Sequence, residues 1–133
     1  MIFPAIHSLI AACKAESVDI PADRKELLER IAAYIREHAS NGHPIRLVFI
    51  CTHNSRRSHF GQIAAAVAAA YYGVSGVEVF SGGTEATAFH PHAIAALREL
   101  GFVITTPTPD VDNPVWSVHF GEQAATQCFF QSF

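Results

Sequence analysis

A cysteine, an arginine and a serine stand close together in the middle of the sequence, as Cys51, Arg57 and Ser58. The polar segment that joins them follows an apolar run at 45–50 and precedes an alanine-rich segment at 60–72, an order typical of strand, loop and helix. In such a loop, successive backbone N–H groups can point inward, and the N-terminal end of the helix adds positive potential. The spacing therefore predicts a site for a tetrahedral oxyanion with a thiol at its base.

Each residue type in this segment suits one task in such a site. Inward amides, a helix end and a guanidinium all favour the charged form of a thiol, so Cys51 is predicted to be a thiolate nucleophile. Arg57 can donate two N–H bonds to two anion oxygens, and Ser58 can donate a hydrogen bond to the sulfur. These three are the predicted catalytic residues. The predicted oxyanion-binding residues are Thr52, His53, Asn54, Ser55, Arg56 and Arg57.

The flanking segments predict the elements that must position this loop. Apolar β-formers at 45–50 and at 77–80 indicate two strands, and the segments 60–72 and 91–100 are typical of helices that end at glycine. The segment 115–120 predicts a further strand. Strands and helices that alternate with short connections predict an α/β domain with a doubly wound parallel sheet.

The residues before Pro44 form a separate part in this interpretation. Apolar positions recur at helical spacing within 1–14 and within 21–39, and Asn41-Gly42 supplies a stop signal. The sequence therefore predicts an N-terminal helical hairpin at 1–43 and an α/β domain at 44–133. The hairpin carries no obvious chemistry, so its expected role is packing against the main domain or, in a homo-oligomer, against a second subunit.

The segment from Val48 to Ser58 resembles the signature of the low-molecular-weight protein tyrosine phosphatases and the homologous arsenate reductases. The resemblance continues through Ser81-Gly82-Gly83-Thr84-Glu85 and the helical segment after Pro91, and it covers roughly residues 45 to 106. It implies flavodoxin-like strand order, the roles given above for Cys51, Arg57 and Ser58, and Asn54 as organiser of the loop. It also implies a C-terminal part of the domain that this sequence lacks.

The sequence departs from the family pattern at three points. His53 stands where the family has glycine, and Arg56 stands where it often has a second cysteine. The family's general acid, an Asp followed by Pro far downstream, has no counterpart, since the sequence contains no Asp-Pro. Loss of leaving-group protonation typically lowers a rate by about 10²–10⁴-fold.

The sequence alone is consistent with three functions. The first is a cysteine-dependent protein tyrosine phosphatase that works through a thiophosphate intermediate. The second is an arsenate reductase that uses the same cysteine together with an external thiol, a thioredoxin-like reductant or a second thiol of the chain. The third is an oxyanion-binding remnant without turnover. The expected ligands are accordingly a phosphate-type oxyanion or phosphotyrosine.

Amino-acid composition and charge indicate which partners, compartment and bound groups to expect. With 16% charged residues and a formal net charge of -3, the chain has no global basic field for nucleic acid or an anionic membrane. Three scattered cysteines form neither a disulfide framework nor a zinc ligand set, which favours a reducing cytoplasm. The histidines around Pro91 lack metal-ligand spacing, so neither metal nor cofactor is expected.

Overall fold

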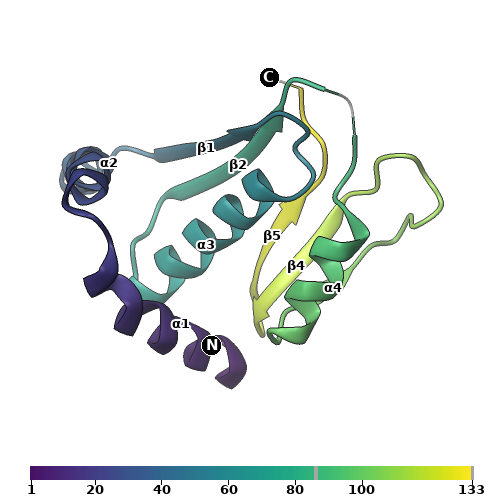
Figure 1. Cartoon of the computed structure of the whole chain (residues 1–133), viewed down its shortest axis with the longest axis horizontal. Coiled ribbons are helices and arrows are strands. Elements are labelled where there is room, and N and C mark those ends of the chain that lie inside the picture. The colour runs from purple at the N-terminus through teal and green to yellow at the C-terminus, as the bar shows by residue number, and fades with distance from the viewer. Residues whose placement is uncertain (86, 133) are drawn as a thin grey trace.

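The chain folds into a mixed α/β structure, shown in Figure 1. The computed structural model describes residues 1–85 and 87–132, and Ala86 and Phe133 lie outside the described residues. The elements in order are α1 (Pro4–Glu16), the short 3-10 helix η1 (Ser17–Asp19), α2 (Ala22–Ser40), β1 (Ile45–Cys51), α3 (Arg57–Tyr72), β2 (Val77–Gly83), α4 (Pro91–Glu99), β3 (Val103–Thr105), β4 (Trp116–Gly121) and β5 (Ala124–Cys128).

β1 and β2 are parallel neighbours that α3 connects. Their register runs from Ile45 opposite Val77 to Cys51 opposite Gly83. Parallel strands need a crossover connection, and α3 provides it while covering one face of the pair. The predicted parallel β-α-β unit is thus confirmed, and its register brings the ends of both strands together beside Cys51.

The opposite face of this parallel pair is open in the described structure. Val48 and Ile50 on β1 are each 47% exposed, and Phe80 on β2 is 39% exposed. A doubly wound parallel sheet, which the sequence predicts, has helices on both faces. In the described part of the chain, only the α3 face is covered.

The strands after α4 form a separate antiparallel sheet in the order β3-β4-β5. A two-residue turn, Glu122-Gln123, joins β4 to β5, and so short a connection permits only antiparallel pairing. The predicted doubly wound parallel sheet is therefore wrong for residues 103–128. α3 packs against both sheets and links them (Figure 1).

α1 packs against the second half of the chain. Phe3 donates its N–H to the carbonyl of Phe120, and Ile6 is fully buried. Gly101 allows the close approach, because its φ is +107° and a Cβ there would lie 2.5 Å from the Cβ of Ala5. One buried cluster therefore draws on α1, α3, α4 and the antiparallel sheet: Ile6, Ile63, Val67, Phe89, Ala93, Ile94, Leu97, Phe102, Ile104, Val118, Phe120 and Cys128.

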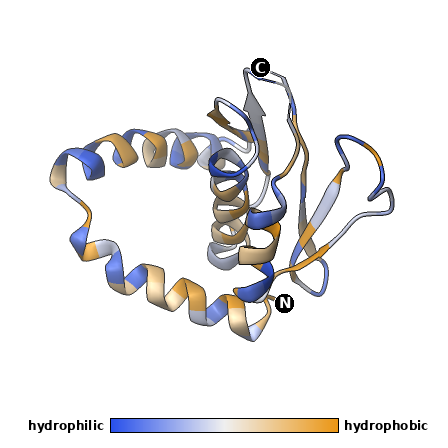
Figure 2. Ribbon diagram, turned by 45° about the vertical axis from the view of Figure 1, so that its right-hand side comes forward, coloured by the Kyte–Doolittle hydropathy of each residue, from blue (hydrophilic) through white to orange (hydrophobic). Residues whose placement is uncertain are grey.

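α2 diverges from α1 after the turn at 17–21, as Figure 2 shows. Its apolar residues Leu27, Leu28 and Ile31 are 54%, 46% and 48% exposed. None of the helices in the described ranges combines the length and apolar character needed to cross a membrane. The division of the chain at residue 43 stays a prediction.

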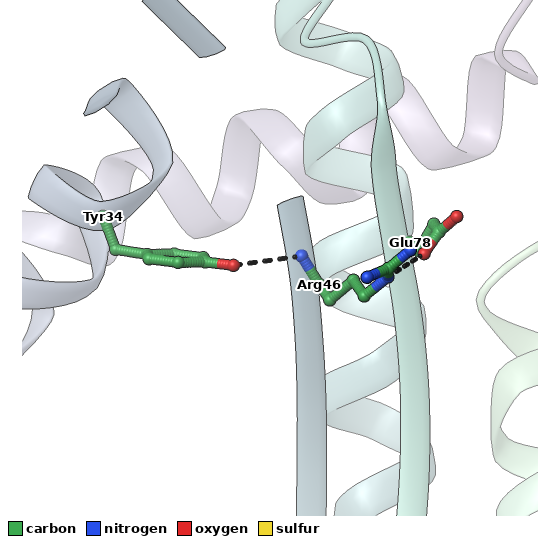
Figure 3. A network of polar contacts seen from close by, with 3 residues as sticks. All are labelled: Tyr34, Arg46 and Glu78. Atoms are coloured by element: carbon green, nitrogen blue, oxygen red, sulfur yellow. Dashed lines mark hydrogen bonds and ion pairs between the residues drawn. The ribbon is translucent and has the colours of Figure 1, made fainter. Parts of the chain in front are cut away.

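The second half of α2 is attached to the start of β1 by a polar contact (Figure 3). Tyr34 Oη accepts a hydrogen bond from the backbone N–H of Arg46 at 3.3 Å. The Arg46 side chain reaches across to Glu78 on β2, with 2.7 Å between Nε and Oε2. Glu78 raises the pKa of the Arg46 guanidinium by accepting that hydrogen bond. These contacts fix where β1 begins, and β1 in turn carries Cys51 at its other end.

Candidate oxyanion-binding site

The segment predicted to bind an oxyanion lies between β1 and α3. Cys51 is the last residue of β1, Thr52 to Arg56 form an irregular loop, and α3 begins at Arg57. Asn54 has a φ of 49°, the left-handed conformation that Asn tolerates better than most residues. The chain therefore reverses at Asn54, and the loop curls over the N-terminal end of α3.

A chain of side-chain hydrogen bonds leads from Asn54 to the thiol. Asn54 Nδ2 donates to Ser58 Oγ at 2.7 Å, and Ser58 Oγ lies 3.2 Å from Cys51 Sγ. Asn54 and Ser58 are both buried, with exposed fractions of 0% and 3%. Because Ser58 Oγ already accepts from the amide, its own hydroxyl hydrogen is free to be donated to a thiolate at Cys51.

These contacts favour the charged form of Cys51. Partial burial raises the pKa of the thiol, but the Ser58 hydroxyl and the backbone N–H groups of Ser58, Asn54 and Ser55 lower it and together prevail. The pKa of Cys51 is therefore lower than that of an ordinary cysteine. A lowered pKa is what a thiol needs to act as a nucleophile near neutral pH.

A second segment holds the loop from the other side, beyond the end of β2. A Cβ added to Gly83 would lie 2.8 Å from the N of Asn54, so only glycine allows this approach. The Thr52 carbonyl accepts hydrogen bonds from the N–H groups of Thr84 and Glu85, at 2.9 and 3.0 Å. Ser81, Gly82 and Gly83 are the last residues of β2, and Gly83 admits the loop beside the end of this strand.

The C-terminal segment also holds the loop. The N–H of Gln131 donates to Asn54 Oδ1 at 2.8 Å, and the N–H of Gly83 donates to the Gln131 carbonyl at 2.9 Å. Ser132 pairs with Gly83 as a parallel bridge. No pattern in the sequence pointed to this role, because residues 54 and 131 are far apart along the chain.

The loop lines a cavity of about 690 Å³. On the loop side it is lined by Cys51, His53, Ser55, Arg56 and Arg57, and on the other side by residues of the segment before α4 and its start: Thr87, Ala88, Phe89, His90 and Pro91. The structure thus brings together the predicted nucleophile, both arginines, His53 and Ser55. It places Asn54 and Ser58 beneath the cavity, where they support the loop, and Thr52 is tied to residues 84 and 85.

Charged groups on the cavity rim are partly paired. His53 Nε2 lies 2.8 Å from Glu85 Oε2, and the hydroxyl of Thr87 donates to the His53 carbonyl. The backbone N–H of His90 donates to the Ser55 carbonyl at 2.9 Å, so the start of α4 also holds the loop. Desolvation, with the neighbouring positive charge of Arg56, lowers the pKa of His90. On the loop side, the rim thus carries the guanidinium groups of Arg56 and Arg57, and His53 lies against Glu85.

His59 is a supporting residue that sequence reasoning missed. Its side chain is fully buried, its Nδ1 lies 3.1 Å from Ser81 Oγ, and its ring lies 4.5 Å from the ring of Phe89. Burial lowers its pKa to about 4, so the imidazole is neutral in the folded chain.

Other thiols and acids lie away from the cavity. Cys13 is exposed on α1, and Cys128 is fully buried in β5, where burial raises its pKa to about 12. Asp110 and Asp112 are not among the residues that line the cavity. In the described ranges, no group of three or more His, Cys, Asp or Glu side chains is placed to hold a metal ion.

Comparison with known proteins gives one partial relation. The chain is similar to an arsenate reductase of Brevibacillus brevis, with 42% identity over 65 residues. The similar region is 49% of this chain and 46% of that protein, so the chain matches about half the length of its curated relative. No family model and no solved structure matches. The chain is thus distantly and partially related to an arsenate reductase, and membership of the wider phosphatase and reductase family stays a prediction.

The hydrogen bond from Ser58 gives a testable consequence for Cys51. We expect Ser58→Ala to raise the pKa of Cys51, because alanine removes the hydroxyl donor that stabilises the thiolate. The rate of alkylation by iodoacetamide, followed against pH in a Cys13→Ser background, reports the fraction of thiolate. In Ser58→Ala the rise in rate should move to higher pH.

Ser55→Ala is the matched control for this prediction. Ser55 acts on the sulfur through its backbone N–H, which alanine retains. Its profile should match that of the Cys13→Ser parent. Superimposable profiles for Ser58→Ala and the parent would contradict the assignment of Ser58.

The buried His59 predicts acid sensitivity. An unfolded histidine binds a proton below its ordinary pKa of 6.5, whereas the folded one does so only near pH 4. As the pH falls, His59 therefore gains its proton in the unfolded state first, which favours unfolding. Stability present above pH 6.5 should be lost between pH 6.5 and 4, on the order of 3 kcal/mol for the full shift.

Chemical denaturation of the wild type and of His59→Phe at pH 7 and pH 4 tests this prediction. The difference between the two proteins removes the contribution of other titrating groups. The variant should lose less stability than the wild type over this interval. An equal loss in both proteins would show that His59 does not titrate as its burial predicts.

Proposed function

We propose that this chain is an arsenate reductase that uses Cys51 as its nucleophile and takes electrons from an external thiol. The observation that carries the proposal is the thiol of Cys51, with its lowered pKa, at a cavity that Arg56 and Arg57 line and whose phenylalanine, Phe89, is only 3% exposed. The partial similarity to an arsenate reductase supports the same choice.

The first step is attack of the Cys51 thiolate on the arsenic atom of arsenate. A sulfur–arsenic bond forms and one arsenic–oxygen bond breaks, and the departing oxygen takes a proton from solvent and leaves as water. Arg57 and the loop amides are proposed to hold the remaining oxygens, since a guanidinium can donate two parallel hydrogen bonds to them. This step needs no carboxylic acid from the chain if solvent supplies the proton.

The second step needs another thiol. A thiolate attacks Cys51 Sγ, a disulfide forms, and the electron pair of the sulfur–arsenic bond passes to arsenic, which leaves as arsenite. A second external thiolate then reduces the disulfide and restores Cys51. Cys128 is poorly suited to this role because it is fully buried and its pKa is raised to about 12. Cys13 lies on α1, outside the residues that line the cavity.

Hydrolysis of phosphotyrosine finds less support in the same cavity. An aryl phosphate needs an aromatic surface beside the loop, but Phe89 is only 3% exposed and its ring faces His59. Tyr71 and Tyr72 stand at the far end of α3 from Arg57. We therefore place inorganic arsenate ahead of an aryl phosphate as the substrate.

An assay of arsenite formation tests the proposal. Purified chain with arsenate and dithiothreitol should form arsenite, and Cys51→Ser should reduce the rate to the background of dithiothreitol alone, because serine cannot form the sulfur–arsenic bond. Cys13→Ser and Cys128→Ala should retain turnover, because dithiothreitol supplies the second thiol and neither cysteine is needed for that step. Thermal unfolding with and without arsenate shows for each variant whether the protein is folded and binds the anion.

Other results of these assays would indicate a different function for the site. Equal rates for wild type and Cys51→Ser would exclude a reductase based on this thiol. Loss of turnover in a folded Cys128→Ala variant would contradict the external-thiol step. Hydrolysis of p-nitrophenyl phosphate without arsenite formation would indicate a phosphatase, and arsenate binding without either reaction would indicate a binding protein.

A further inference from the structure

A second cavity lies between α1, α3 and the end of α4, away from Cys51. Its volume is about 510 Å³, within the range of roughly 300–1,000 Å³ typical of small-molecule sites. Nearly all of its lining side chains are apolar or aromatic: Leu9, Ile10, Cys13, Lys14, Ser17, Phe60, Ile63, Ala64, Val67, Ala68, Tyr71, Tyr72, Leu97, Leu100 and Phe102. It shares no lining residue with the cavity at Cys51.

Several large side chains of this cavity are in contact with solvent. Tyr72 is 62% exposed, Leu100 is 46% exposed and Phe60 is 38% exposed. They stand beside Ile63 and Phe102, which are 2% and 5% exposed. An apolar molecule in this cavity would remove further apolar surface from water, which is favourable by about 25 cal/mol per Å².

Two polar groups meet at one end of the cavity. Lys14 Nζ donates a hydrogen bond to Tyr71 Oη at 3.4 Å, and it lies 5.4 Å from the centre of the Tyr71 ring. Lysine has three N–H donors and tyrosine one O–H donor, so donors remain for an anion. Among the described residues, no carboxylate forms an ion pair with Lys14. This end of the cavity is complementary to a negative charge.

We propose that this cavity binds a small amphipathic carboxylate, a molecule with a medium-length alkyl body and one carboxylate. The alkyl body lies among the apolar side chains of α1, α3 and α4, and the carboxylate accepts hydrogen bonds from Lys14 Nζ and Tyr71 Oη. The proposal is independent of the function assigned to Cys51.

The apolar face of α2 is the main competing occupant. Leu27, Leu28 and Ile31 are exposed, so α2 of a second copy could cover the same surface. We prefer the small carboxylate because Leu27, Leu28 and Ile31 are apolar and offer no hydrogen-bond acceptor to Lys14 Nζ and Tyr71 Oη, whereas a carboxylate on an alkyl body matches both ends of the cavity. The second copy is therefore an outcome that the experiment must distinguish.

Titration calorimetry with decanoate and decanol tests the proposal. Decanoate should bind the wild type with one site per chain and should bind at least roughly ten-fold more tightly than decanol, since the carboxylate forms charge-assisted hydrogen bonds. Lys14→Met should reduce the affinity for decanoate to that for decanol. Lys25→Met, a matched change on the exposed surface of α2, should bind as the wild type does.

Ala68→Trp tests the place of binding, because Ala68 is an exposed cavity residue of α3 and a larger side chain there fills the cavity. The variant should bind neither probe, and Ala64→Leu serves the same purpose should the tryptophan variant fail to fold. Decanoate should also slow alkylation of Cys13 in a Cys51→Ser background.

Absence of decanoate binding, or unchanged affinity in Lys14→Met, would overturn the proposal. So would self-association of the wild type that Ala68→Trp abolishes.

Discussion

The position of the buried Asn54 side chain is the constraint on which the candidate site depends. Its amide nitrogen donates to Ser58 Oγ and its amide oxygen accepts from the N–H of Gln131, so both ends of the side chain are used. Its backbone is left-handed, and Gly83 approaches within a distance that no Cβ would allow. β1, α3, β2 and the C-terminal segment therefore all meet at this residue. A buried amide with both ends satisfied stabilises one loop conformation, whereas loss of either partner leaves a buried polar group unpaired.

This constraint has an electrostatic consequence for Cys51. A thiolate that receives hydrogen bonds from a hydroxyl and from backbone amides is stabilised without a neighbouring lysine or histidine. Arg56 and Arg57 line the cavity, and among the described residues neither forms an ion pair, so both can bind an anion there. Since His59 is neutral and buried beneath the loop, it supports Ser81 through a hydrogen bond and adds no charge.

The local features of the site could be predicted from the sequence, whereas its tertiary contacts could not. The strand at 45–50, the loop and the following helix could be predicted, because a change from apolar β-formers to polar residues and then to alanine marks those boundaries. The contacts of Asn54 with Gly83 and Gln131 could not be predicted, because they join segments that are distant in the sequence. The antiparallel sheet was missed because Glu122-Gln123 carries no glycine or asparagine to mark a hairpin turn. The pattern of α2 predicted a helix correctly but could not show that Leu27 and Leu28 would be exposed.

A crystal structure of the chain with orthovanadate tests the central claim most directly, because vanadate can bond to a thiolate at a site built for a tetrahedral oxyanion. We expect vanadium to be bonded to Cys51 Sγ, with its oxygens accepting hydrogen bonds from the loop amides and from Arg57. We also expect the Asn54–Ser58 hydrogen bond to be retained. Vanadate bound elsewhere, or a loop in which Cys51 Sγ turns away from the anion, would contradict it.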